Sequence, residues 1–164
     1  MSYSIPIEGD LKLSTTYQFK PTPGVEMDFI EGNACSLDKD IKYNCITGAN
    51  LIDRLPSPMD FFTTLPEIVE IGGIVVLTSP YTWLEQYTPR SEWLPNLVLD
   101  KETGRKVENS EDLAPTQKTT FEALVTIMSP HFQLVQQSHV PFFIYETARK
   151  AQYSLAHCTV WQRK

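Results

Sequence analysis

The sequence predicts an α/β fold with a mixed, mostly parallel sheet and an antiparallel strand at its C-terminal end. The first observation is a strand–helix–strand pattern that ends in residues 74–78 (IVVLT). This continuous, largely β-branched run is typical of a strand buried on both faces of a parallel sheet. The second observation is the alternating run of residues 151–161, which follows the apolar residues 142–145 after a short connection. Such a connection favours antiparallel pairing.

The N-terminal part of the sequence predicts two strands. Residues up to Gly24 look irregular because they contain four breakers, Pro6, Gly9, Pro21 and Pro23. Residues 25–31 (VEMDFIE) alternate in part and end at a glycine, which predicts a strand. Residues 43–48 (YNCITG) are moderately apolar and predict another.

A helix is expected between the strands at 43–48 and 74–78. Ser57 suits its N-cap and Pro58 its first position, and Gly72-Gly73 is expected to end it, with a kink at Pro66. Its apolar positions follow helical spacing, at Phe61, Phe62, Leu65, Ile68 and Val69.

The second half of the sequence predicts a loop, a helix and two strands. Residues 97–115 are polar and rich in turn residues, which indicates a long loop. Residues 116–128 carry apolar side chains on one helical face, and Pro130 is expected to stop that helix. Strands are expected at residues 132–139 and 151–161.

Composition restricts the function classes. The 164 residues suit one domain, and 14 Lys and Arg against 20 Asp and Glu leave a net charge of −6, which argues against nucleic-acid binding. The sequence shows no membrane span or signal peptide, and its three cysteines lack CxxC spacing. We therefore expect a reduced, cytoplasmic domain without a metal site.

Ligands of open α/β sheets bind outside the carboxyl ends of the strands. The segments after the predicted strands are residues 33–35, 49–54 and 79–93. Asn50 could be a ligand contact or a turn residue, and the Asp53-Arg54 pair an active-site pair or a local ion pair. Residues 79–93 interleave aromatic and hydrogen-bonding side chains, which favours a pocket for a polar, planar ligand over a protein interface.

No other constellation of catalytic residues stands out. The sequence contains no Ser/His/Asp set, Walker loop or HExxH motif, and the three histidines have no ligand-like spacing. His157 alternates within a predicted strand and is interpreted as a core or face residue. Cys45 is interpreted as a small buried hydrophobe.

Several segments resemble one enzyme family. ANLIDRLPSP, followed by GGIVVLTSPYTWLEQYTPRSEWL, is similar to the C-terminal S-adenosylmethionine-dependent methyltransferase domain of ovothiol biosynthesis enzymes, the 4-mercaptohistidine N1-methyltransferase family. YSIPIEGDL, VEMDFIEGNACSL and PFFIYETARKAQYSLAHCTVW extend the resemblance over nearly the whole chain apart from residues 97–115. It implies a class I, Rossmann-like methyltransferase fold and methyl transfer to an imidazole nitrogen of a thiolated histidine.

The resemblance also implies roles for individual residues. The cofactor S-adenosylmethionine would meet Asn33, Ala34 and Cys35 at its adenine edge and Asn50 and Leu51 at its methionine part. The small histidine-derived substrate would face Tyr81, Thr82, Trp83 and Glu85, with Tyr81 and Glu85 as catalytic groups. Arg90 and Trp93 would form a lid, and Glu146 would contribute to substrate binding.

The chain departs from the family pattern at three places. Asn33 stands where the family usually has Asp, and Tyr145 stands before Glu146 where the family has Arg. The first strands of the family fold and their glycine-rich loop have no counterpart, so residues 1–164 are interpreted as a single partial domain. The resulting exposed sheet edge favours association with a partner chain or a second copy. The alternative function is a non-catalytic binding or assembly module.

Overall fold

The computed structural model describes residues 2–18, 20, 22–107 and 118–164 of the chain. They divide into two compact units, described separately here. The first comprises Met1–Glu31 and Pro141–Leu155, and the second comprises Gly32–Val140 and Ala156–Lys164. Strands β5 (Phe132–Thr147) and β6 (Lys150–Arg163) contribute to both units.

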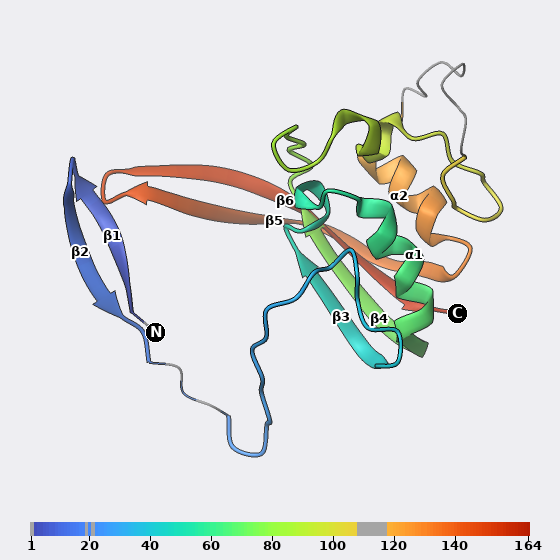
Figure 1. The fold of residues 1–164 in the computed structure, drawn as a ribbon, viewed down its shortest axis with the longest axis horizontal. Coiled ribbons are helices and arrows are strands. Elements are labelled where there is room, and N and C mark those ends of the chain that lie inside the picture. Colours follow the sequence, from blue (N-terminus) through green and yellow to red (C-terminus); the bar gives the residue numbers. More distant parts are fainter. Residues whose placement is uncertain (1, 19, 21, 108–117) are drawn as a thin grey trace. The chain divides into compact units, whose positions relative to one another are not determined.

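The first unit contains an N-terminal β-hairpin that the sequence analysis missed. Strands β1 (Ser2–Glu8) and β2 (Leu11–Thr16) pair antiparallel, and Gly9 turns the chain with φ of +52° (Figure 1). The prediction of an irregular start is therefore wrong for residues 2–16. Pro6 is tolerated because a two-stranded sheet consists of edge strands, where a missing N–H need not break a ladder. The Pro6 carbonyl oxygen accepts a hydrogen bond from the Ala148 N–H at 3.1 Å.

The strand predicted at residues 25–31 is also wrong. The structure places these residues outside both sheets, and Phe29 and Ile30 are 84% and 89% exposed. A strand needs a neighbouring strand to receive its backbone hydrogen bonds, and apolar alternation alone does not supply one.

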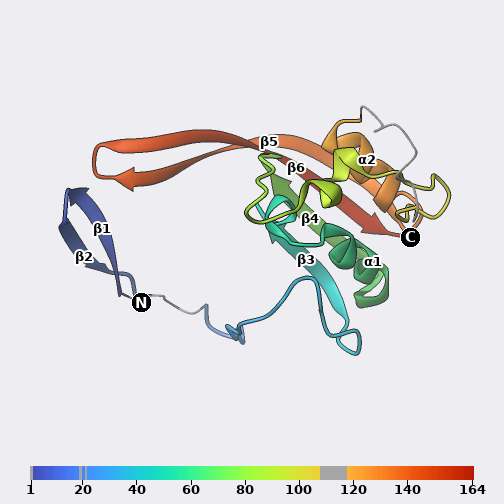
Figure 2. The same ribbon diagram turned by 45° about the horizontal axis from the view of Figure 1, so that its top comes forward.

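The second unit contains the mixed sheet, with strand order β3-β4-β6-β5 (Figures 1 and 2). Strand β3 (Tyr43–Ala49) pairs parallel with β4 (Val69–Ser79), and β4 pairs antiparallel with β6. A two-residue connection joins β5 to β6. The predicted β-α-β unit and the antiparallel C-terminal strand are therefore present.

Helix α1 (Pro58–Ile68) begins where predicted but ends before the glycine pair. Strand β4 starts at once, and Gly72 and Gly73 lie inside it, where the pairing with β3 shifts register. Gly72 has φ of +80°, and a Cβ at Gly73 would lie 2.8 Å from the Glu70 carbonyl oxygen. The glycines therefore form a bulge in the strand instead of ending the helix.

Helix α2 (Thr120–Met128) begins with a capping box. The Glu122 N–H donates to the Thr119 hydroxyl, and the Glu122 carboxylate accepts from the Thr119 N–H at 2.7 Å. These bonds hold the pKa of Glu122 below its usual range. The predicted start at residue 116 lies outside the described residues, as do residues 108–115 of the predicted loop. The described part of that loop is anchored, because Leu97 and Leu99 are buried.

Both helices pack on one face of the sheet. Their apolar side chains form a single core cluster with alternate residues of β4 and β6, including Val75, Leu77 and Trp161. The intervening residues Val76 and Val160 point to the other face and are only half-buried. The described residues thus cover one face of the sheet more completely than the other.

Candidate functional site

Two residues with positive φ mark the carboxyl ends of the parallel strands. Asn50 follows β3 with φ of 50°, and Tyr81 lies just beyond β4 with φ of 55°. The Asn50 N–H donates to the Thr78 carbonyl at 2.8 Å, which ties the first turn to β4. Non-glycine residues with positive φ are uncommon and concentrate at functional sites. The geometry therefore supports a candidate site at this edge.

Asp53 connects the two turns and is the best-buried charged group of the site, with 0% of its surface exposed. Its Oδ1 accepts from the Ser79 hydroxyl at 3.0 Å, and its Oδ2 accepts from the Thr82 N–H at 3.0 Å. Arg54 pairs with Oδ2 at 2.9 Å and also donates to the Thr82 carbonyl at 2.7 Å. The Asp53-Arg54 ion pair therefore also bonds to the 79–82 turn and holds it in place.

Tyr81 is joined to a histidine on β6. The Tyr81 hydroxyl lies 2.8 Å from Nδ1 of His157, and Nε2 of His157 lies 3.1 Å from the Gln137 Oε1. Because that amide oxygen can only accept, Nε2 carries the proton and Nδ1 accepts from Tyr81. His157 also stacks on His139, with ring centroids 5.2 Å apart and an angle of 22°.

The electrostatics favour neutral side chains in this pair. Burial, followed by the negative charge of Asp53, raises the pKa of Tyr81 to about 12. Burial and the neighbouring His139 lower the pKa of His157 from its usual value. At neutral pH the pair is therefore a phenol that donates to a neutral imidazole, and the phenol oxygen keeps its lone pairs for a ligand.

His157 was missed as a site residue in the sequence analysis, which interpreted it as a core or face residue. Alternation along β6 is a signal in the sequence, because it places His157 on the same face as Thr159 and Trp161. The structure adds that His157 pairs with Ser79 at the end of β4. The interpretation of Cys45 as buried is wrong, because its side chain is exposed on β3.

The predicted substrate-facing and lid residues form a connected group. Trp83 donates from Nε1 to the Thr120 hydroxyl at 2.9 Å and stacks on Trp93 with centroids 6.3 Å apart. Arg90 lies over the Trp93 ring at 5.3 Å and pairs with Glu85 at 2.9 Å. The Glu85–Arg90 pair is well exposed, so it contributes little to stability.

The predicted cofactor residues divide between two turns. The Asn33 Oδ1 accepts from the Cys35 N–H at 3.0 Å, and the Cys35 Sγ donates to the Ser57 carbonyl at 3.3 Å. Ala34, Cys35 and Leu51 are partly buried and pack against the core. Asn50 and Leu51 belong to the second of these turns. Among the described residues, no hydrogen bond joins it to the turn at residues 33–35.

Glu146 belongs to the first unit, whereas the other predicted site residues belong to the second. It pairs with Lys150 at 2.5 Å and accepts from Gln152. The hydrogen bonds from Lys150 and Gln152 lower the pKa of Glu146. Its predicted contact with substrate stays a prediction.

The described residues show neither a metal centre nor a membrane-spanning helix. No group of three His, Cys, Asp or Glu side chains within them is arranged to hold a metal ion. Among the same residues, every helix is too short or too polar to cross a membrane.

No family model matches the chain, and no curated protein matches it. One similar solved structure comes from work on the conversion of a disulfide bond into a thioacetal group during echinomycin biosynthesis, with 10% identity and a TM-score of 0.48. The match covers 81% of this chain, which spans about half (54%) of that protein. Another is a SAM-dependent methyltransferase from Methanosarcina mazei, with 17% identity, a TM-score of 0.48, and coverage of 87% and 72%. At TM-scores below 0.5 these likenesses decide neither fold nor activity.

Acidification is expected to destabilise the fold through His157. The unfolded chain binds a proton with the ordinary histidine pKa of about 6.5, whereas the folded chain binds it at lower pH. The unfolded state therefore binds more protons between these values, and the free energy of unfolding falls as the pH drops below about 6.5. Urea titrations across this range should show a smaller pH dependence for His157→Gln. An unchanged pH dependence in this variant would show that His157 is not the group responsible.

Proposed function

We propose that the chain belongs to an S-adenosylmethionine-dependent methyltransferase and forms the part that holds the methyl acceptor. One observation carries this proposal. The two segments with the most specific resemblance, NLIDRL and SPYTWLE, follow different strands and are joined through Asp53 at the carboxyl edge of the sheet. Ligands of doubly wound α/β proteins bind at this edge.

The proposed acceptor is an imidazole nitrogen of a thiolated histidine, by resemblance to the ovothiol family. Bound S-adenosylmethionine would supply an electrophilic methyl group to this nitrogen, with a neutral thioether as the leaving group. The acceptor would also have to lose its N–H proton. The Tyr81 oxygen is suited to take this proton while the phenol passes its own proton to Nδ1 of His157. Glu85, paired with Arg90, is suited to orient the substrate.

The cofactor would bind across the turns at residues 33–35 and 49–51. The Asn33 Oδ1 is already engaged by the Cys35 N–H, although a carbonyl oxygen can accept a second bond. Asn50 offers an amide at the strand end. This sequence has no glycine-rich loop after a strand to cradle the rest of the cofactor.

We therefore expect weak or undetectable binding of S-adenosylmethionine by the 164-residue chain. Titration calorimetry tests this, and micromolar binding would contradict it. A version extended at its N-terminus by a strand and a glycine-rich loop should bind the cofactor and methylate mercaptohistidine. Asn50→Ala in the extended version should weaken cofactor binding, whereas Asp40→Ala, at an exposed position, should not. Failure of the extended, folded version to act on mercaptohistidine would contradict the proposed substrate.

A second candidate function is a non-catalytic assembly module. Two observations favour it. Strand β3 is the end strand of the described sheet, and the sheet face opposite both helices is only half-buried. The module would complete its sheet with another polypeptide or a second copy. Light scattering of the purified chain separates the cases, because a concentration-dependent dimer supports self-association, and a stable monomer leaves a different polypeptide as the partner.

A further inference from the structure

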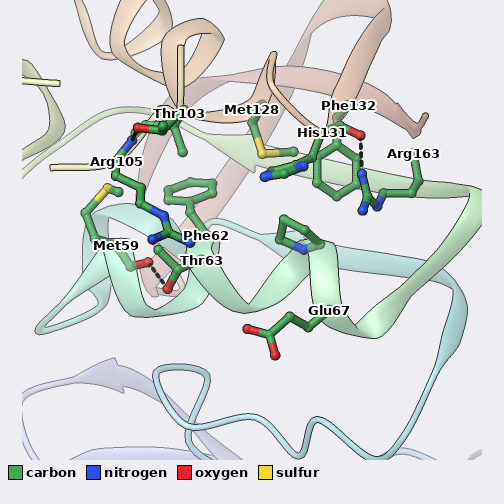
Figure 3. A pocket seen from close by; sticks show the side chains of 13 residues that line it. Met59, Phe62, Thr63, Glu67, Thr103, Arg105, Met128, His131, Phe132 and Arg163 are labelled. Atoms are coloured by element: carbon green, nitrogen blue, oxygen red, sulfur yellow. Dashed lines mark hydrogen bonds between the residues drawn. The ribbon is translucent and has the colours of Figure 1, made fainter. Parts of the chain in front are cut away.

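A pocket of about 380 Å³ lies in the second unit, away from the candidate site (Figure 3). It is bounded by α1, the turn at residues 103–105, the end of α2, the start of β5 and the end of β6. Since the last turn of α1 leads directly into β4, the pocket lies toward the amino end of that strand. The candidate site lies beyond the carboxyl end of the same strand.

Polar and apolar side chains contribute about equally to the wall of the pocket. Figure 3 shows Phe62, Met128 and Phe132 among the apolar lining residues. Met59 and Ile127 also contribute to the lining. A volume of this size, with apolar groups beside a few polar ones, is typical of sites for small organic molecules.

Two arginines and a histidine, Arg105, Arg163 and His131, line the pocket. Within the described lining, Glu67 is the only acidic residue. Glu67 is already paired with Lys39 at 2.8 Å. Among the described residues, neither Arg105 nor Arg163 has a carboxylate within ion-pair distance.

Arg163 retains an unused donor. Its Nη1 donates to the His131 carbonyl at 2.8 Å, and its guanidinium lies 5.5 Å from the centre of the Phe132 ring. Its Nε is buried, however, and has no hydrogen-bond partner in the described structure. A buried donor without an acceptor is unfavourable, so the protein alone does not satisfy the hydrogen bonds of this guanidinium group.

The turn that carries Arg105 is held in place before any ligand binds. The Asp100 carboxylate accepts from the N–H and the hydroxyl of Thr103, each at 2.7 Å. Gly104 has φ of +68°, and a Cβ there would lie 2.6 Å from the Ile127 carbonyl oxygen. The turn therefore packs closely against the end of α2, which fixes the base of the Arg105 side chain.

We propose that this pocket binds a small organic anion whose phosphate or carboxylate is held by Arg105 and whose apolar body extends along the lining toward Arg163. Guanidinium groups suit both anions because their donors match the spacing of the anion oxygens. The pocket is independent of the methyl-transfer proposal, because it shares no lining residue with the candidate site.

His131 gives the site a reporter. Burial, then the positive charges of Arg163, Arg105 and Lys164, lower its pKa. Glu67 on α1 is the acidic group that lines the same pocket. An anion bound in the pocket would offset the field of the arginines and raise the pKa of His131. Binding therefore takes up protons at mildly acidic pH and strengthens as the pH falls.

Phenyl phosphate is a suitable probe, with inorganic phosphate and benzyl alcohol as its separate halves. Titrations of the 164-residue chain by NMR should give saturable shifts at the amides of Thr103, Gly104 and Phe132, together with a raised pKa of His131. Phenyl phosphate should bind at least about tenfold more tightly than either half, since both the apolar wall and the charge contribute.

Substitutions locate the binding and keep the test decisive. Arg105→Gln should weaken phenyl phosphate binding about tenfold or more, while Arg149→Gln, the same change in the first unit, should leave it unchanged. Arg163→Gln serves as the second pocket variant, and a native-like spectrum confirms that each variant folds. Absence of saturable shifts, equal binding of inorganic phosphate, equal binding of benzyl alcohol, or full affinity in Arg105→Gln would overturn the proposal. Tyr81→Phe should not affect this binding.

Discussion

Asp53→Ala is expected to lower the free energy of unfolding by about 3–5 kcal/mol, because it removes one partner of a buried, hydrogen-bonded ion pair. The substitution leaves the Ser79 hydroxyl and the Thr82 N–H without their acceptor, and the Arg54 guanidinium without its carboxylate partner. Ser79 is itself 1% exposed, so water does not readily replace the lost oxygen. Urea denaturation followed by circular dichroism measures the effect.

Two further variants test whether the loss of stability comes from the buried carboxylate of Asp53. Asp40→Ala removes an exposed aspartate and should change stability by no more than about 0.5 kcal/mol. Asp53→Asn keeps one acceptor oxygen but replaces the other with a donor that faces Arg54 and Thr82, so a substantial loss should remain. A loss in Asp53→Ala as small as that in Asp40→Ala would show that the 79–82 turn is held by other contacts.

The same network explains which parts of the site could be predicted from the sequence. The turns at Asn50 and Tyr81 follow two strands that the sequence predicts, so their positions at the carboxyl edge follow from the parallel order of β3 and β4. The sequence alone could not show whether Asp53 belongs to the site or only to a local ion pair, because an Asp-Arg dipeptide makes a local pair in many settings. Only the fold shows that its carboxylate reaches Ser79 and Thr82.

The wrongly predicted elements share a physical cause, because each depends on which strand pairs with which. Residues 25–31 have a strand-like pattern but no place in either described sheet, whereas Ser2–Thr16 contains breakers and still forms a hairpin because Gly9 provides the turn. The Gly72-Gly73 pair can end a helix or form a bulge, and the pairing of β4 with β3 decides between them. Local patterns specify an element's type more reliably than its partners.

Trp161→Ala is the core substitution with the largest expected effect, a loss of about 3–5 kcal/mol in the free energy of unfolding. Trp161 is fully buried on β6 opposite Val75 of β4, and its Nε1 donates to the Thr159 hydroxyl at 2.9 Å. It joins β6 to the cluster that both helices cover.

Because β6 also carries His157, this core contact links stability to the candidate site. Trp161→Ala should weaken the antiparallel pairing that brings His157 beside Tyr81, so the NMR signature of the imidazole with its proton on Nε2 should be lost before global unfolding. Trp161→Phe retains most of the apolar volume and should lose less stability and keep that signature. The control Ile71→Ala alters a side chain of β4 that is 74% exposed and should leave both properties intact. Loss of stability in Trp161→Ala with an unchanged His157 signature would show that the Tyr81–His157 pair is held by its own contacts and not by the core beneath β6.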